Sequence, residues 1–136
     1  MKTFIRSMSV VFSSGCFGGL INSLAVWISG TLGITKVLGV KLAPALTPSW
    51  LYPRIVWGGL WGLLFLLPFL RRSSYLRGLL YSLGPTAVQL FIVFPVQAQK
   101  GLMGVDLGTM TPIFVLFFNA VWGICTALWL RSIEDT

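Results

Sequence analysis

The chain has 136 residues, of which 56% are hydrophobic and 10% are charged, whereas charged residues make up roughly 25% of ordinary soluble domains. It has no histidine and three acidic residues, so it offers almost no ligands for a metal ion. The formal net charge is +7, but the basic residues lie at the ends of apolar runs, as membrane topology determinants do. No basic stripe is interleaved with aromatic residues, which argues against a nucleic-acid partner.

Four stretches carry no charged residue: residues 7–35, 55–70, 78–99 and 107–130. A helix needs about 20 mostly apolar residues to cross a hydrocarbon core of about 30 Å. Three of the stretches reach this length. The second is short, and we expect it to extend back through Trp50, Leu51 and Tyr52. We therefore predict an all-α integral membrane protein with four transmembrane helices in a single domain, residues 1–136.

The first helix is expected over residues 9–33. Basic residues followed by an apolar run resemble a signal peptide, but this run continues past Cys16 to Trp27, so we expect a retained span. Small and polar residues recur every three or four positions, which places them on one face. They are Gly15, Gly18, Asn22, Ala25 and Ser29, with Gly19 beside them. Such a face either packs against another helix or lines a cavity, and the spacing favours packing.

Three prolines make residues 35–54 an irregular loop, because proline interrupts helical hydrogen bonding. The second helix is expected over residues 53–70. Within it, Gly58 and Gly62 are spaced for close helix packing. Pro68 is expected to kink the last turn.

The third helix is expected over residues 76–96, with Gly78, Ser82, Pro85 and Gln89 on one face. Pro85 should bend it, since a mid-helix proline leaves a backbone carbonyl without its donor. The fourth helix is expected over residues 112–130. Asn119, Gly123 and Thr126 share one of its faces.

One stretch occurs twice at an offset of 65 residues. Seven of the twenty residues from 39 to 58 match the residue 65 positions further on, where chance would give two or so; they include Val56, Trp57 and Gly58. We infer two tandem helical hairpins, residues 9–70 and 76–131, although shared membrane composition is the alternative. Two-span units enter the membrane from the same side, so the repeats are parallel. Lys41 aligns with Asp106 as a candidate salt bridge between the two loops.

Orientation follows from counting Lys and Arg. The termini and the turn around residues 71–77 hold six, and the two proline-bearing loops hold four. This bias predicts both termini in the cytoplasm, and we expect the inner membrane of a bacterium.

The apolar runs contain no acidic, basic or histidine side chain, so we expect neither an enzyme nor a cofactor. Cys16 and Cys125 fall in apolar runs, where a disulfide is not expected. Uncharged polar side chains at depth should face protein or water. The candidate lining residues of a cavity are Asn22, Gln89, Asn119 and Arg54; Arg54 also starts the shortest run, where its side chain has the alternative of reaching the membrane surface.

Three functions are compatible with this pattern. The leading one is a structural or accessory membrane protein that packs through its glycine seams into a homo-oligomer or against other membrane subunits. The second is a passive channel or facilitator for a small polar solute, built from the four lining residues. The third, a lipid- or pigment-associated subunit, rests only on six Trp and ten Phe. Membrane lipids are partners in each case.

Overall fold

The computed structural model describes residues 2–41, 44–67, 69 and 72–134. This part of the chain is 83% helical and contains no strand. Three segments are long and apolar enough to cross a membrane: α1 (Lys2–Thr31), the continuous helix Ser74–Gln97, and α5 (Thr111–Glu134). The all-helical character expected from the sequence is therefore confirmed, and three of the described helices have the length and apolar composition of a membrane span.

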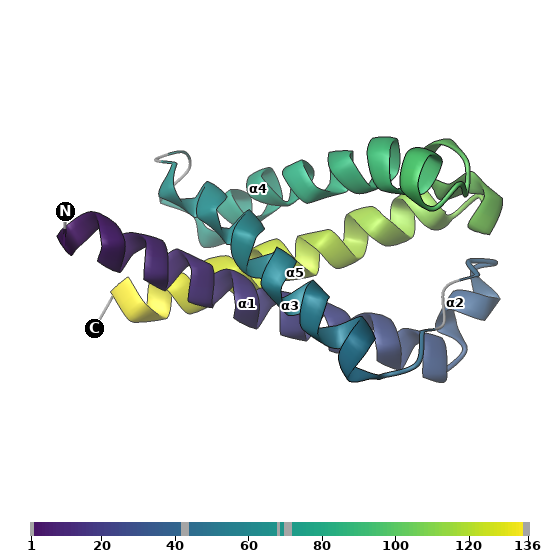
Figure 1. Cartoon of the computed structure of the whole chain (residues 1–136), viewed down its shortest axis with the longest axis horizontal. Helices are drawn as coiled ribbons and strands as arrows, with labels where there is room; N and C mark the ends of the chain where they lie inside the picture. Colours follow the sequence, from purple (N-terminus) through teal and green to yellow (C-terminus); the bar gives the residue numbers. More distant parts are fainter. Residues whose placement is uncertain (1, 42–43, 68, 70–71, 135–136) are drawn as a thin grey trace.

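Helices α1 and α5 form the centre of the bundle. Helix α1 packs on one side against α3 (Pro48–Gly62) and on the other against α5, and α5 also packs against α4 (Ser74–Val88). Both termini lie at one end of the bundle (Figure 1). The short helices α2 (Ile34–Val37) and η3 (Leu102–Leu107) lie at the opposite end, which we call the loop end.

Helix α1 begins at Lys2, seven residues before the expected start. Apolar length defines only the part of a helix inside the hydrocarbon, and here the helix continues into its polar flank because no Gly or Pro interrupts residues 2–8. Helix α5 likewise continues past the expected end at 130.

Helix α3 begins at Pro48, five residues before the start that the sequence predicted at residue 53. The Thr47 side chain caps it by accepting the Trp50 N–H at 3.3 Å, and Pro48 occupies the first turn, where a missing N–H costs nothing. The helix ends at Gly62 and continues as the 3₁₀ helix η1 (Leu63–Leu66). Pro68, expected to kink this helix, lies outside the described residues.

Helix α4 begins at Ser74, capped by the Ser73 side chain, and continues through Pro85 without ending. From Gln89 it widens into a π-helix, η2 (Gln89–Gln97), which also contains Pro95. Prolines withhold donors from the regular i→i−4 ladder, and π segments occur where that ladder is interrupted.

Glycines set the helix crossings. Gly15 and Gly19 of α1 meet Gly58 and Gly62 of α3, and a Cβ added at Gly58 would lie 2.7 Å from the Gly15 carbonyl oxygen. Gly18 faces α5, and Gly123 of α5 meets Gly78 of α4. The glycines at these crossings therefore join helices of the same chain; they are Gly15, Gly18, Gly19, Gly58, Gly62, Gly78 and Gly123.

Two tryptophans that match at the 65-residue offset lie in different environments. Trp57 is 61% exposed on the outside of α3, whereas Trp122, its equivalent at the 65-residue offset, is 4% exposed. Its indole N–H donates to the Gly15 carbonyl at 3.2 Å.

Apolar clusters lie toward both ends of the bundle. One, at the end that carries the termini, contains Val11, Phe65, Tyr81, Trp122 and Leu130. Two others lie toward the loop end, around Phe118 and around Phe94.

Candidate functional site

Two open cavities, each of about 400 Å³, adjoin in the middle of the bundle. The loop-side cavity reaches Lys41, Pro44 and Trp50. The second, which we call the α3/α4 cleft, runs between those two helices. Four side chains line both cavities, and we call them the polar cluster: Asn22, Arg54, Gln89 and Asn119. These are the four candidate lining residues named from the sequence.

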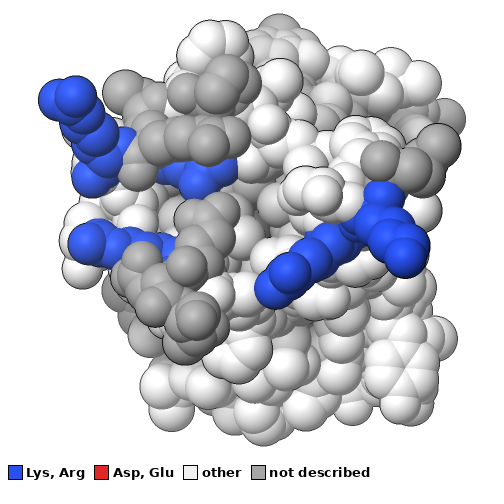
Figure 2. All heavy atoms as spheres, turned by 90° about the vertical axis from the view of Figure 1, so that its left-hand side faces the viewer, with Lys and Arg blue, Asp and Glu red and all other residues white. Residues whose placement is uncertain are grey.

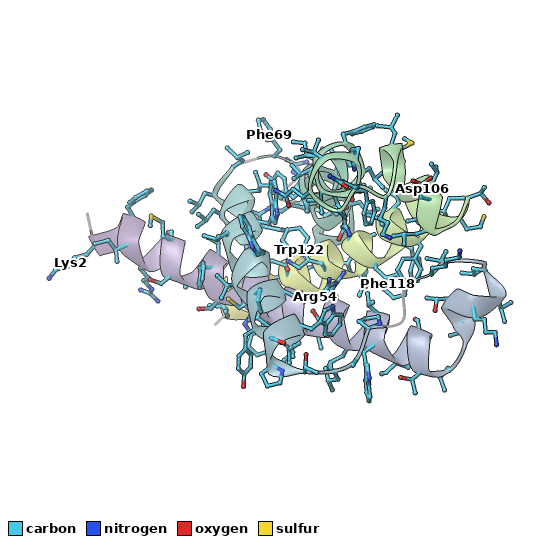
Figure 3. The ribbon with its side chains drawn as sticks, turned by 45° about the vertical axis from the view of Figure 1, so that its right-hand side comes forward. Lys2, Arg54, Phe69, Asp106, Phe118 and Trp122 are labelled. Carbon is cyan, nitrogen blue, oxygen red and sulfur yellow. The ribbon has the colours of Figure 1, made fainter. Side chains whose placement is uncertain are left out.

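Arg54 points inward from α3. Its Nε donates to Ser23 Oγ at 2.9 Å and its Nη2 to Asn22 Oδ1 at 2.7 Å. Its guanidinium also lies over the Trp50 ring, 4.7 Å from the centroid. Figure 3 shows Arg54 in the middle of the bundle, near Phe118 and Trp122. The side chain is therefore held inside the bundle rather than extended toward a helix end.

Asn22 links three helices. It lies on α1, its Oδ1 accepts from Arg54 of α3, and its Nδ2 donates to the Phe118 carbonyl of α5. The side chain is 6% exposed. Both ends of the amide are bonded, so the residue is fixed, and it holds Arg54 toward the cavities.

Asn119 forms the matching contact on the other side of the polar cluster. Its Nδ2 donates to Thr86 Oγ1 at 3.1 Å and to Gln89 Oε1 at 3.3 Å, both in the α4–η2 segment. Gln89 is the first residue of the π-helix. The change from α-helical to π-helical hydrogen bonding therefore begins at a residue that lines both cavities.

Arg54 and Asn119 are equivalent at the offset of 65 residues, and their bonding is similar. Arg54 binds residues 31 and 32 positions earlier, on α1. Asn119 binds residues 30 and 33 positions earlier, in the α4–η2 segment. Both contacts lie at the same cavities.

The cavities carry positive charge. Arg54 and Lys41 line them, and none of the described residues that line them is acidic. In the described part of the chain no group of His, Cys, Asp or Glu could hold a metal ion. The polar atoms present can donate or accept hydrogen bonds and attract an anion.

The two loops meet through their backbones. The Lys41 N–H donates to the Leu107 carbonyl at 2.8 Å, next to Asp106. Among the described residues no ion pair joins the Lys41 and Asp106 side chains, and Asp106 lies beside Gly101. The salt bridge between them stays a prediction.

Sequence reasoning missed two polar residues. Thr86 supports Asn119, and its position one turn before Gln89 on the same face was the available signal. Arg77, counted with the basic turn, is only 7% exposed. Its Nη2 donates to the Phe65 carbonyl, and its guanidinium carbon lies 5.2 Å from the Phe65 ring centroid and 5.9 Å from the Tyr81 ring centroid.

Protein-family models, curated proteins and solved structures were each compared with the chain, and none matches. Its function is therefore inferred from the geometry of the cavities.

Proposed function

We propose that this chain is a four-span, non-enzymatic membrane protein that receives a small polar group in its cavities and gives it a passive route across the bilayer. The group is either a free solute or the head of a lipid. The carrying observation is that four polar side chains from four helical segments converge on two adjoining cavities. An ionisable side chain at membrane depth is costly and usually functional.

The fourth span is the segment formed by α3 and η1. The chain enters α1 and leaves α5 at the same end of the bundle, where α4 also begins (Figure 1). The stretch between α1 and α4 must therefore cross back. Fifteen residues of α3 and four of η1 reach about 30 Å at 1.5 and 2.0 Å per residue, which matches the hydrocarbon thickness.

The inward position of Arg54 strengthens the orientation argument. When Arg54 and the buried Arg77 are both left out, the loop end holds three basic residues, Lys36, Lys41 and Lys100, against five near the termini and the basic turn. Figure 2 views the end that carries the termini, with Lys and Arg side chains around it. We propose cytoplasmic termini in a bacterial inner membrane, with the loop-side cavity opening on the opposite side.

Two tandem parallel hairpins are part of this proposal. The matched bonding of Arg54 and Asn119 supports the duplication. So do the glycine crossings at Gly58 and Gly123, which are also 65 residues apart.

A flux assay tests the function. Purified protein is reconstituted in proteoliposomes and tested with four probes: glycerol, urea, inorganic phosphate and a fluorescent phospholipid. At least one probe should cross faster than in protein-free vesicles, and Asn22→Leu and Gln89→Leu should slow it. The control is Ile113→Leu, on an outward face of α5 (58% exposed). If no probe crosses faster than in protein-free vesicles, the proposal fails.

The accessory role is the competing proposal. The glycine seams that suggested it are occupied within the chain, so an oligomer or subunit contact has to use other surfaces. A native mass in detergent that shows a stoichiometric protein partner, together with no flux, favours that role.

A further inference from the structure

The α3/α4 cleft opens sideways from the polar cluster. Helices α3 and α4 flank the α1–α5 pair and lie apart, and the wall between them is apolar and aromatic. It includes Trp57, Trp61, Pro85, Val88 and Ile92. At its rim, Trp57 is 61% and Ile92 48% exposed. In a membrane this rim faces the lipid hydrocarbon, so the cleft connects the bilayer to Arg54.

Arg54 brings a positive charge to the inner end of the cleft without a negative partner. Its Nε and Nη2 donate to neutral oxygens, those of Ser23 and Asn22. No described residue bonds its Nη1. Asp106 is not among the residues that line either cavity.

The other acidic residues lie at the end of the chain. Glu134 ends α5 sixteen residues after Phe118, which is about 24 Å along a helix. Among the residues that the structure describes, none therefore places a carboxylate against Arg54.

A guanidinium removed from water needs an anion, and its planar fork matches phosphate oxygens. A ligand that supplies this anion here also meets an apolar, laterally open wall. A free inorganic anion would reach Arg54 from water through the loop-side cavity and would not contact the apolar wall. An amphiphile contacts Arg54 with its anionic head and the apolar wall with its hydrocarbon chain.

We propose that the α3/α4 cleft binds an anionic phospholipid, with the lipid phosphate at Arg54 and an acyl chain between α3 and α4. The polar cluster contacts the head group, and Trp57 and Ile92 contact the chain. Lys41, in the adjoining cavity, adds a second positive charge that favours anionic over zwitterionic heads. The volume of about 400 Å³ lies within the range of about 300–1,000 Å³ usual for ligand sites. This inference rests on the proposed function and names the class of its ligand.

Native mass spectrometry of the full chain in detergent tests the proposal, with phosphatidylglycerol and phosphatidylcholine as competing probes. Wild type should retain one phosphatidylglycerol with a preference of about tenfold or more, and Arg54→Gln should lose that preference. Arg72→Gln is the matched control, because it removes the same charge from an exposed position; its preference should equal that of wild type.

Two further variants cover the case in which Arg54→Gln does not fold. Val88→Phe narrows the cleft and should lower binding of both lipids without a change in head preference. Arg54→Lys keeps the charge and should keep a reduced preference. Equal retention of the two lipids by wild type overturns the proposal. So does a preference that survives in Arg54→Gln or a binding level unaffected by Val88→Phe.

Inorganic phosphate distinguishes the source of the anion. If it binds with the same Arg54 dependence and phosphatidylglycerol does not, the lipid assignment is wrong. The proposed function and this inference fail separately. Cavity-dependent flux of glycerol or urea without lipid preference leaves the function and removes the inference. Selective lipid binding without flux of any probe removes the proposed function and leaves the lipid-binding inference.

Discussion

Arg54 of α3 donates to Asn22 Oδ1 of α1 at 2.7 Å, and the Asn22 amide donates in turn to the Phe118 carbonyl of α5. This chain of two bonds fixes three helices around a guanidinium that none of the described side chains neutralises. An amide at this position can both accept from the cation and donate to the carbonyl, which no apolar side chain of similar size can do. Packing and the proposed ligand site therefore depend on the same residue.

Asn22→Leu should lower the free energy of unfolding by about 1–3 kcal/mol, because it leaves Arg54 Nη2 without its acceptor in a buried setting. Thermal unfolding in detergent measures the loss. Ser13→Leu is the control on the exposed face of α1, where the hydroxyl bonds only its own helix. Equal melting temperatures for the two variants would show that the Asn22 bonds contribute nothing.

Gly58→Ala should separate α1 from α3. The added Cβ would lie 2.7 Å from the Gly15 oxygen and 2.9 Å from the Gly19 Cα, and backbone atoms at a helix crossing do not yield locally. We expect a loss of about 1–3 kcal/mol in stability, read from thermal unfolding.

Gly84→Ala is the matched control for that substitution. Its Cβ would meet only side-chain atoms, with Leu64 Cδ1 nearest at 3.0 Å. A small rearrangement of Leu64 relieves this contact, and alanine favours the helix by up to about 1 kcal/mol. A loss at Gly84 as large as that at Gly58 would contradict the proposed role of the crossing.

The helix faces were predictable from sequence, whereas the burial of Arg77 was not, and the direction of Arg54 was left open between a cavity and the membrane surface. Spacing of three and four residues identified Gly58, Asn22 and Asn119 as inward-facing. The start of α3 was predicted wrongly at residue 53, although Thr47 followed by Pro48 is a helix-start signal. The direction of Arg54, however, depends on how α3 crosses α1. The burial of Arg77 depends on the turn after α3, where η1 brings the Phe65 carbonyl to α4. Both are tertiary relationships that no local pattern contains.

Arg77→Leu should destabilise the end of the bundle that carries the termini. It removes the donor to the Phe65 carbonyl and the contacts with two aromatic rings. Hydrogen bonds from charged groups contribute about 1.5–3 kcal/mol, so the loss should be of that size. Arg72→Leu, at an exposed position, should change stability by less than about 0.5 kcal/mol. Chemical denaturation of both variants makes the comparison, and matching midpoints would mean that the buried contacts of Arg77 are not stabilising.

Cysteine labelling should distinguish four spans from three. In a background with Cys16 and Cys125 replaced by alanine, Lys36→Cys at the loop end should react with an impermeant maleimide in intact cells. Ser132→Cys near the C-terminus should react only after permeabilisation. With three spans, the C-terminus would lie on the side opposite the N-terminus, and Thr3→Cys and Ser132→Cys would then label from opposite sides.

Exchanging the polar groups of the two hairpins tests whether they are equivalent. Arg54→Asn alone should lower anionic lipid binding by about tenfold or more, because it removes the cation from the cavities. Adding Asn119→Arg places a guanidinium beside Thr86 Oγ1 and Gln89 Oε1, which already accept from Asn119. These oxygens can hold the cation as Ser23 and Asn22 hold Arg54, and the same cavities receive its charge. The double variant should therefore recover most of the lost binding in the native mass assay. If the double variant binds no better than Arg54→Asn, the two hairpins do not present equivalent positions to the ligand. The positive charge that binds the lipid then has to be on α3.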